Sequence, residues 1–451
     1  MSLNRRTISR ARSYIERSGT APISITISTD WIYGGDDEEG ENQAILEFVE
    51  LIRDYTERIF KLNDNLNETL LGTFCLKLPL NFPSVQYLTL TNHSSAGEDP
   101  PIIPFLRQEY PQLRKLVLTC LIPFSIPGFN NFPNLQELSL NQENGSTLYP
   151  DLKVFLDLLE GISSRLVALQ LIRVGPLKPI SLLSEDRVVE MQTLKKFTIK
   201  NEAGRVVGLL NHLILPATCA LSILGDKLHD TSSHGLWEVL PRNPRALASL
   251  QQVEELCAKV NSFDCCTTST GKSPSFSITL SWQDDIPQED LRPLLFNAIV
   301  DIPTMFSDAL LTILDLGFDF AQCSKQWLKT ILDKYPTLEV LQLKNIFVQS
   351  RPATISPVMI VLCYDHTVRG LPIHPICPRL DILEFVNFII DVDWFNEVQR
   401  CLLSRKPKKL GRFTFLGCHG ARYDENIDWN EQGMTDLVGE YMLKQHDLNF
   451  G

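Results

Sequence analysis

Apolar and polar positions alternate along this chain in a recurring phrase, L-x-x-L-x-L, in which Phe, Val or Ile sometimes replaces Leu. The first three copies end the stretches FPSVQYLTL (82–90), YPQLRKLVL (110–118) and FPNLQELSL (132–140). The closing Leu-x-Leu has the two-residue period of a β-strand with one buried face. The proline of each lead-in removes a backbone donor and ends a preceding helix. Each copy therefore predicts a strand that follows a helix breaker.

Seven further copies of the phrase follow, and helix-like runs such as 151–162 and 325–335 lie between copies. A strand and a helix that repeat about every 20–30 residues are typical of leucine-rich repeats, in which no single strand can bury its apolar side alone. The predicted fold class is therefore α/β: a leucine-rich-repeat solenoid with a curved parallel sheet on its concave face and helices or irregular segments on its convex face. The further copies are LVALQL (166–171), LKKFTI (194–199), LNHLIL (210–215), LTILDL (311–316), LEVLQL (338–343), LDILEF (380–385) and LGRFTF (410–415).

The spacing of the copies is irregular between Leu213 and Leu314. In this interval FSITLSW (276–282) predicts a further strand, RALASLQQVEELCAKV (245–260) predicts a helix, and TTSTGKSPS (267–275) predicts a flexible loop. We therefore place a boundary at that loop. The predicted organisation is a helix and strand cap at 1–80, N-terminal repeats at 81–266, and C-terminal repeats at 267–451 that continue the same solenoid.

The composition of the chain bears on which classes of partner it can bind and on its compartment. The 451 residues include 42 Lys and Arg against 54 Asp and Glu, a formal net charge of −12. This charge argues against nucleic acid, whose binding depends on Lys and Arg contacts to phosphates. No run of about 18 apolar residues occurs, so the sequence predicts no membrane span. Eleven cysteines without regular spacing indicate free thiols in a reducing compartment, the cytoplasm or the nucleus.

Motifs for catalysis or metal binding are incomplete. The stretch TGKS (270–273) resembles the end of a phosphate-binding loop, but that loop needs an earlier glycine where Cys266 stands. The stretches CYDH (363–366) and HPIC (374–377) lack the paired ligand spacing of a structural zinc site. The sequence thus predicts no enzyme, no cofactor and no metal. An enzyme with a site in the irregular stretch 217–275 is the least favoured alternative.

A surface is the most informative candidate for function. The residues between the leucines of each phrase point to the concave side of the sheet, which repeat proteins commonly use to bind other proteins. Across the ten copies this side carries five basic and three acidic residues, a slightly basic balance on an acidic chain. A weakly acidic protein ligand and a chance excess at such small counts both fit this balance. The candidate partner-binding residues are Tyr87, Lys115, Glu137, Gln170, Lys196, Lys200, Gln342, Lys344, Glu384 and Arg412.

The stretch ISRARSYIERSGTAPISITIS (8–28) reads as an amphipathic helix, a turn, and a strand that follows Pro22. It resembles a segment of the fungal family of F-box/leucine-rich-repeat proteins, in which a helix ends in an E-R-S-G-like turn before such a strand. Two further stretches are similar to later elements of that family: 46–64, a helix that leads to a strand, and 210–224, in which Leu-Pro joins two apolar strands. The resemblance implies that the chain has the partner-recognition half of such proteins.

Members of that family begin with an F-box, which docks on the adaptor of a cullin-RING ubiquitin ligase, and no stretch of this chain matches that module. We therefore expect a fragment, a truncated gene product or a relative without an F-box. The expected function is a non-catalytic protein-interaction scaffold that binds a protein ligand on its concave face. The alternative is a substrate receptor of a ubiquitin ligase whose F-box is missing from this sequence. The ligase adaptor becomes a partner only if an F-box is restored.

Overall fold

The structure is a computed structural model, which divides into two compact units, Met1–Cys219 (unit 1) and Ala220–Gly451 (unit 2). The boundary predicted at 266–267 lies outside the described residues. The described residues are 5–28, 38–66, 71, 74, 77, 82–92, 110–121, 132–142, 152–174, 187–228, 240–241, 247, 250, 253–259, 276–282, 300–318, 320, 323–345, 353–362, 376–390, 394–405, 409–420 and 438–444.

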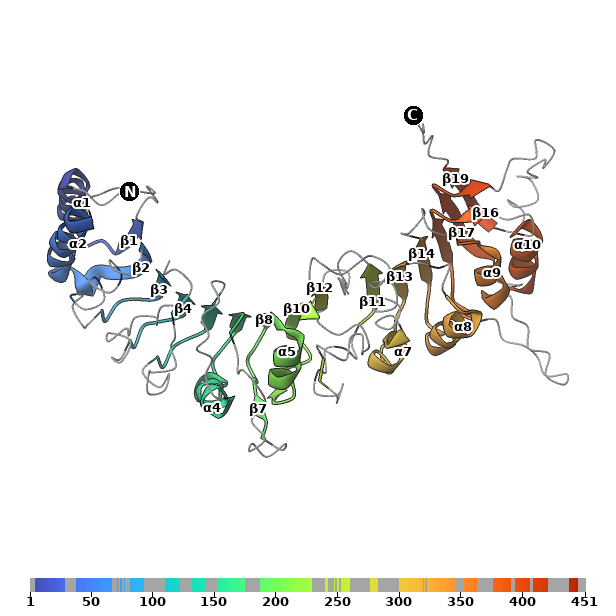
Figure 1. Ribbon diagram of the computed structural model, residues 1–451, viewed down its shortest axis with the longest axis horizontal. Helices are drawn as coiled ribbons and strands as arrows, with labels where there is room; N and C mark the ends of the chain where they lie inside the picture. The colour runs from blue at the N-terminus through green and yellow to red at the C-terminus, as the bar shows by residue number, and fades with distance from the viewer. Residues whose placement is uncertain are drawn as a thin grey trace. The chain divides into compact units, whose positions relative to one another are not determined.

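Unit 1 combines a helical cap with a parallel sheet (Figure 1). The sheet has the order β1-β2-β3-β4-β5-β6-β8, so each strand lies beside the one that precedes it in the sheet along the chain. The short strands β7 and β9 pair separately. The elements are α1 (Arg5–Arg17), β1 (Ile23–Ser28), α2 (Glu38–Arg53), a 3-10 turn (Thr56–Arg58), β2 (Ile59–Leu66), β3 (Tyr87–Asn92), β4 (Lys115–Thr119), β5 (Glu137–Asn141), α4 (Leu152–Ile162), β6 (Ala168–Ile172), β7 (Val189–Glu190), β8 (Lys196–Glu202), α5 (Ala203–Leu210) and β9 (Leu213–Ile214).

Unit 2 contains a second run of parallel strands, in the order β11-β13-β14-β15-β17-β19. Strand β10 pairs with β12, and the short strands β16 and β18 pair with each other. The elements are β10 (Ala220–Leu228), β11 (Glu255–Lys259), β12 (Phe276–Trp282), α7 (Ile302–Met305), β13 (Ile313–Phe318), α8 (Lys325–Lys334), β14 (Val340–Asn345), α9 (Ser356–Leu362), β15 (Ile382–Val386), β16 (Ile389–Ile390), α10 (Trp394–Ser404), β17 (Leu410–Leu416), β18 (His419–Gly420) and β19 (Val438–Lys444).

The leucines of the repeated phrase form buried rows, because neighbouring strands pair in register. In unit 1 each side chain of the two rows is at most 1% exposed. Burial of one such side chain contributes roughly 1.5–3 kcal/mol, so every strand depends on its neighbours to complete both rows. The rows are Leu88-Leu116-Leu138-Leu169-Phe197 and Leu90-Leu118-Leu140-Leu171-Ile199 in unit 1, with Leu314-Leu341-Leu383-Phe413 and Leu316-Leu343-Phe385-Phe415 in unit 2.

The aromatic-proline lead-ins form tight turns before the strands. The carbonyl of Phe82 accepts a hydrogen bond from the N–H of Val85 at 3.2 Å, and the carbonyl of Tyr110 accepts one from Leu113 at 3.1 Å. Proline suits the second position of such a turn because its φ is already fixed near the required angle. The aromatic rings are buried, and those of Tyr110 and Phe132 lie 5.9 Å apart. The lead-in thus supplies both the turn and part of the core.

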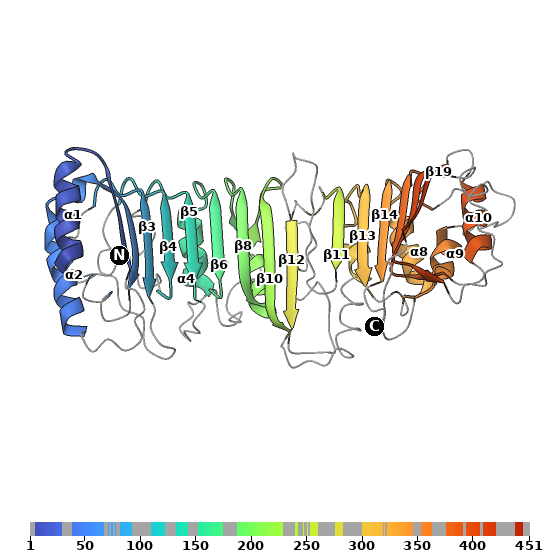
Figure 2. The same cartoon turned by 90° about the horizontal axis from the view of Figure 1, so that it is seen from above.

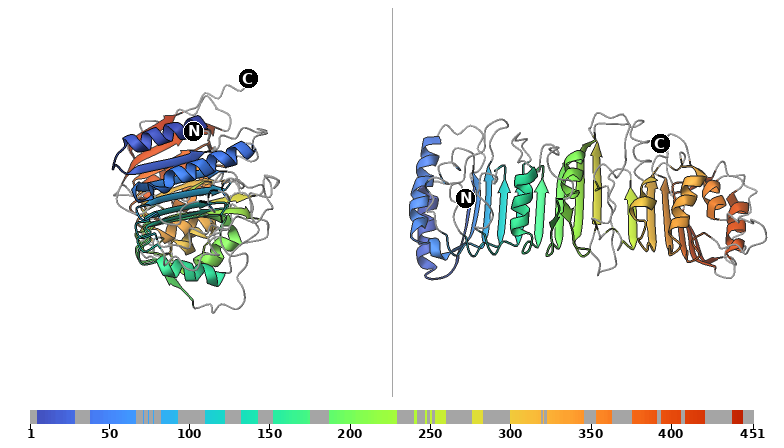
Figure 3. Two further views of the ribbon diagram at one scale, coloured as in Figure 1. Left: turned by 90° about the vertical axis from the view of Figure 1, so that its left-hand side faces the viewer. Right: turned by 90° about the horizontal axis from the view of Figure 1, so that it is seen from below.

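Most of the elements predicted from the pattern are present. The chain is α/β with parallel sheets, as predicted, and nine of the ten phrases lie on strands of the two long runs. Helices cover the predicted runs as α1, α4 and α8, and FSITLSW forms β12. Figure 3 includes a view from below, in which α4 (teal), α5 (green) and the orange helices lie in front of the strands of their own units. No helix in the described part of the chain has the length and apolar character to cross a membrane.

The prediction of a helix at 245–260 is wrong, because Glu255–Lys259 within this range forms strand β11. Leu256 pairs in register with Leu314 of β13. The segment V-x-x-L-x-A, from Val253 to Ala258, is a form of the repeated phrase with alanine in its last position. Its Ala, Leu, Gln, Glu and Lys content has a high helix propensity, but burial beside a neighbouring strand outweighs that preference.

The phrase around Leu213 forms the short strand β9, which pairs with β7 and lies outside the long parallel run. The next strand along the chain is β10, which starts at Ala220. Leu215 and Pro216 lie between β9 and β10, so a Leu-Pro step joins two strands here, as predicted.

Candidate partner-binding face

The open face of unit 1 is the side of its sheet opposite the buried leucine rows. Strand alternation puts three rows of side chains on it, and hydroxyl and amide groups predominate. The rows are Ser24-Lys61-Tyr87-Lys115-Glu137-Ala168-Lys196, Thr26-Asn63-Thr89-Val117-Ser139-Gln170-Thr198 and Ser28-Asn65-Thr91-Thr119-Asn141-Ile172-Lys200.

Charge on this face is predominantly positive. The three rows contain four lysines and a single acidic residue, Glu137. Lys115 pairs with Glu137 at 2.7 Å, with their side chains 43% and 48% exposed, so this pair contributes less than about 1 kcal/mol. Lys61, Lys196 and Lys200 form no ion pair within the described residues. Three uncompensated ammonium groups therefore face solvent on a chain of net charge −12.

Tyr87 is the aromatic residue of this face and is 38% exposed. Its ring packs edge-on against Phe60, with centroids 6.4 Å apart. Lys61 and Lys115 are its neighbours in register on the adjacent strands. A positioned aromatic ring between two cations can bury apolar area of a ligand while the lysines attract its carboxylates.

The open face of unit 2 is the side of its parallel sheet opposite the buried rows. It has a balanced charge, and contacts between its charged side chains hold more of them in place. Lys344 donates to Asp315 Oδ2 at 2.6 Å, and Cys257 Sγ donates to the same oxygen at 3.3 Å. Arg412 pairs with Glu440 at 3.0 Å. These cations already have carboxylate partners, so they are less available to an acidic ligand than the lysines of unit 1.

An apolar strip adjoins these charges in unit 2. Ile313, Val340 and Ile382 lie side by side in register on β13, β14 and β15, and each is partly exposed. Arg412 follows Ile382 in the same row on β17. The strip is a second patch suited to protein contact, of apolar rather than basic character.

The ten predicted residues separate between the two units. Tyr87, Lys115, Glu137, Gln170, Lys196 and Lys200 share the open face of unit 1, and Gln342, Lys344, Glu384 and Arg412 share that of unit 2. Sequence reasoning missed Lys61, because β2 (IFKLNDNL) has Asp64 where the repeated phrase has its last leucine. The alternation of the polar Lys61, Asn63 and Asn65 with Leu62 and Leu66 was the available signal.

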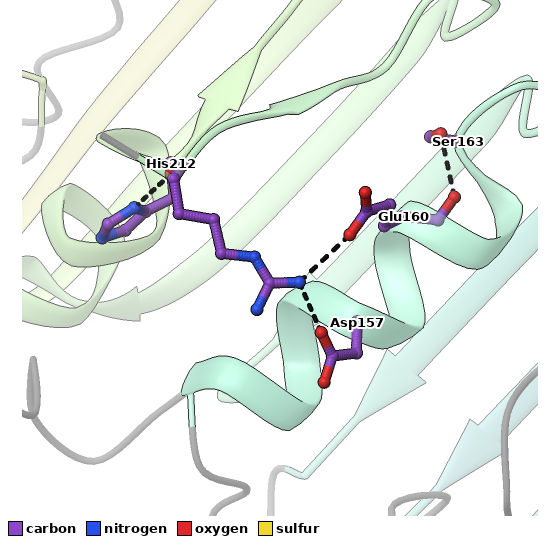
Figure 4. A network of polar contacts seen from close by, with 5 residues as sticks. Asp157, Glu160, Ser163 and His212 are labelled. Atoms are coloured by element: carbon purple, nitrogen blue, oxygen red, sulfur yellow. Dashed lines mark hydrogen bonds and ion pairs between the residues drawn. The ribbon is translucent and has the colours of Figure 1, made fainter. Parts of the chain in front are cut away.

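A polar network on α4 and the β7–β9 pair is structural rather than part of the open face (Figure 4). Arg187, which precedes β7, bonds Asp157 of α4 and, at 3.1 Å, Glu160 of the same helix. His212 Nδ1 lies 2.7 Å from the carbonyl of Arg187. The network ties α4 to both short strands.

In the described part of the chain, no three His, Cys, Asp or Glu side chains gather as a metal site would require. The TGKS stretch and residues 363–375 lie outside the described residues. The side chains of Cys219 and Cys377 are thiols outside any disulfide, and burial raises the pKa of each to about 12, so both stay protonated at neutral pH. No protein-family model and no curated protein matches this chain.

Proposed function

We propose that this chain is a non-catalytic protein-interaction scaffold, built as a leucine-rich-repeat solenoid, whose ligand is an acidic polypeptide. The in-register pairing of nine repeated phrases supports the repeat architecture. The observation that carries the function is the excess of lysine on the open face of unit 1. A rigid sheet holds these side chains at fixed spacing, so a ligand orders few groups of the protein when it binds.

The binding reaction needs no chemistry beyond recognition. Carboxylates of the ligand approach Lys61, Lys196 and Lys200, and an apolar ligand side chain packs on Tyr87. The middle row of the open face presents hydroxyl and amide groups, and two of these residues, Ser139 and Gln170, bond each other at 3.2 Å. When the ligand binds, they exchange that hydrogen bond for hydrogen bonds to the ligand backbone.

Affinity purification with the full chain as bait tests this proposal. The triple variant Lys61→Glu, Lys196→Glu, Lys200→Glu reverses the uncompensated charges and should lose the proteins that the unchanged chain retains. Lys153→Glu, on the exposed side of α4, is the control and should retain them. If quantitative mass spectrometry finds the same proteins with the triple variant and the unchanged chain, the open face of unit 1 is not the binding surface.

The second candidate is a substrate receptor of a cullin-RING ubiquitin ligase. Its support is the segment 8–28, which forms a helix ending at Arg17, a turn with Gly19 at φ +54°, and strand β1, the order found in the family it resembles. A pull-down with the purified ligase adaptor tests it. Stoichiometric recovery supports a ligase role, and no recovery leaves a recognition module alone. The free thiols of the described cysteines support a reducing location, the cytoplasm or nucleus.

A further inference from the structure

A pocket of about 460 Å³ lies between α1 and β1 in unit 1. Strand β1 and the residue before it line the pocket with six consecutive residues, Pro22–Ile27, so residues of both faces of the strand border it. A pocket on one face of a strand would be lined by alternate residues. The pocket therefore runs along the edge of β1, on the side away from β2.

This edge is the first of the sheet. Among the described strands β1 has one neighbour, β2, and every second residue of such a strand directs its N–H and C=O away from that neighbour. Figure 2 shows α1 running beside the sheet at this end. The wall that α1 contributes is largely apolar, with Ile8, Ala11 and Ile15. A row of backbone donors and acceptors thus lies opposite an apolar wall.

The rim of the pocket is basic. Tyr14 lines the pocket although 69% of it is exposed, which places it at the mouth. Arg10 and Arg17 precede and follow Tyr14 by one helical turn, so they flank it on the surface of α1. Both arginines are exposed, and neither forms an ion pair within the described residues. The rim therefore favours a ligand that carries carboxylates.

We propose that this pocket binds an extended acidic peptide, which adds to the sheet of unit 1 as a strand beside β1. The peptide backbone bonds the outward groups of β1, alternate apolar side chains of the peptide contact Ile8 and Ile15, and its carboxylates approach Arg10 and Arg17. An alkyl ligand would remove the same backbone groups from water without replacing their hydrogen bonds, which is unfavourable. The site uses none of the lysines of the open face, so it goes beyond the function proposed above.

Selection from a displayed library of acidic peptides of about ten residues, against the purified full chain, tests the proposal. We expect enrichment of peptides in which apolar residues alternate with polar ones. Hydrogen exchange with the enriched peptide should show protection of the amides of Ile23–Ile27. Fluorescence anisotropy should show that affinity falls about tenfold in Ala11→Trp, which fills the pocket, and about tenfold in the double variant Arg10→Glu, Arg17→Glu. Ser13→Trp, on the opposite side of α1, should bind normally.

Several results would overturn the proposal. One is that the selection enriches no peptide. Another is that the peptide protects the amides of β3–β5 in place of those of β1. A third is that a folded Ala11→Trp protein binds the peptide with unchanged affinity. A fluorescent fatty acid that binds one-to-one, and is lost in Ala11→Trp while no peptide is enriched, assigns the pocket to apolar small molecules. A dimer in sedimentation that Ala11→Trp dissociates assigns the edge to a second copy of the chain. If Ala11→Trp fails to fold, hydrogen exchange on the unchanged chain decides the outcome.

Discussion

Asp64 is the residue that departs most from the pattern of the fold. It lies on β2 in the row formed by Ile27 of β1 and Leu90 of β3. Its side chain has no exposure, and neither carboxyl oxygen has a hydrogen-bond partner among the residues that the structure describes. Burial raises the pKa of this carboxyl well above its usual range, because removal from water disfavours the charged form.

This carboxyl makes stability depend on pH. Its folded pKa exceeds the unfolded value of about 3.9, so its contribution is most favourable below that value and is lost as pH rises toward the folded pKa. We expect Asp64→Leu to raise the free energy of unfolding at pH 7 by about 1–3 kcal/mol and to flatten the fall in stability above pH 4. Urea unfolding at several pH values measures both effects. A less stable Asp64→Leu protein at pH 7 would contradict the assignment of Asp64 to the apolar row.

The register of the rows can be tested at adjacent residues. Leu138 is 1% exposed, between Leu116 and Leu169, while Ser139 is on the open face. Leu138→Asp buries an unpaired carboxylate, which costs several kcal/mol, so we expect the neighbouring strands to unfold. Ser139→Asp should leave the fold intact. Circular dichroism and limited proteolysis distinguish the two variants, and equal behaviour would contradict the register.

At the scale of elements, the side chain of Arg58 links the start of β2 to the turn between α1 and β1. Farther along unit 1, the carbonyl of Gln86 accepts hydrogen bonds from the N–H groups of Arg114 and Lys115, which joins the starts of two strands. Before β1, the carbonyl of Ala21 instead accepts from the Arg58 guanidinium, at 3.2 Å from Nε and 3.1 Å from an Nη. A side chain therefore replaces the backbone donors at this junction.

Removal of the Arg58 side chain should destabilise the α1–β1 segment and leave the rest of unit 1 unchanged. We expect Arg58→Ala to destabilise the α1–β1 segment by about 1.5–3 kcal/mol, the usual contribution of hydrogen bonds to a charged group. Arg58→Lys should recover only part of this, because an ammonium group lacks the planar fork of donors. Hydrogen exchange should rise in Ile23–Ser28 and remain unchanged in Glu137–Asn141. A uniform rise across unit 1 would contradict a local role.

The elements that the sequence predicted best are those whose signal is local. The aromatic-proline turns and the alternation in FPNLQELSL each follow from a few adjacent residues, and both are present in the structure. Strand β11 was missed because V-x-x-L spacing is shared by helices and by this repeat, and only the neighbouring Leu314 decides between them. Six residues of the open face of unit 1 were named from the repeated phrases, whereas Lys61 was missed, since the buried Asp64 interrupts the apolar pattern of β2.

For the whole molecule, the distribution of charge matters more than its sum. The net charge is −12, yet the open face of unit 1 has four lysines and one glutamate. The screening length falls from about 10 Å at 0.1 M salt to about 3 Å at 1 M. We therefore expect binding of an acidic partner to weaken by about tenfold or more over this range, measured by titration calorimetry. Binding that is insensitive to salt would favour the apolar strip of unit 2 as the contact surface.

The order of strands in unit 1 also bears on how the protein is made. Each strand of the sheet pairs with the strand of the same sheet that is synthesised before it. At about 5–20 residues per second, a repeat of about 25 residues leaves the ribosome every one to five seconds or so. The neighbour of every new strand has thus been synthesised before it. Unit 1 can therefore grow during translation by successive addition of strands at a single edge of the sheet.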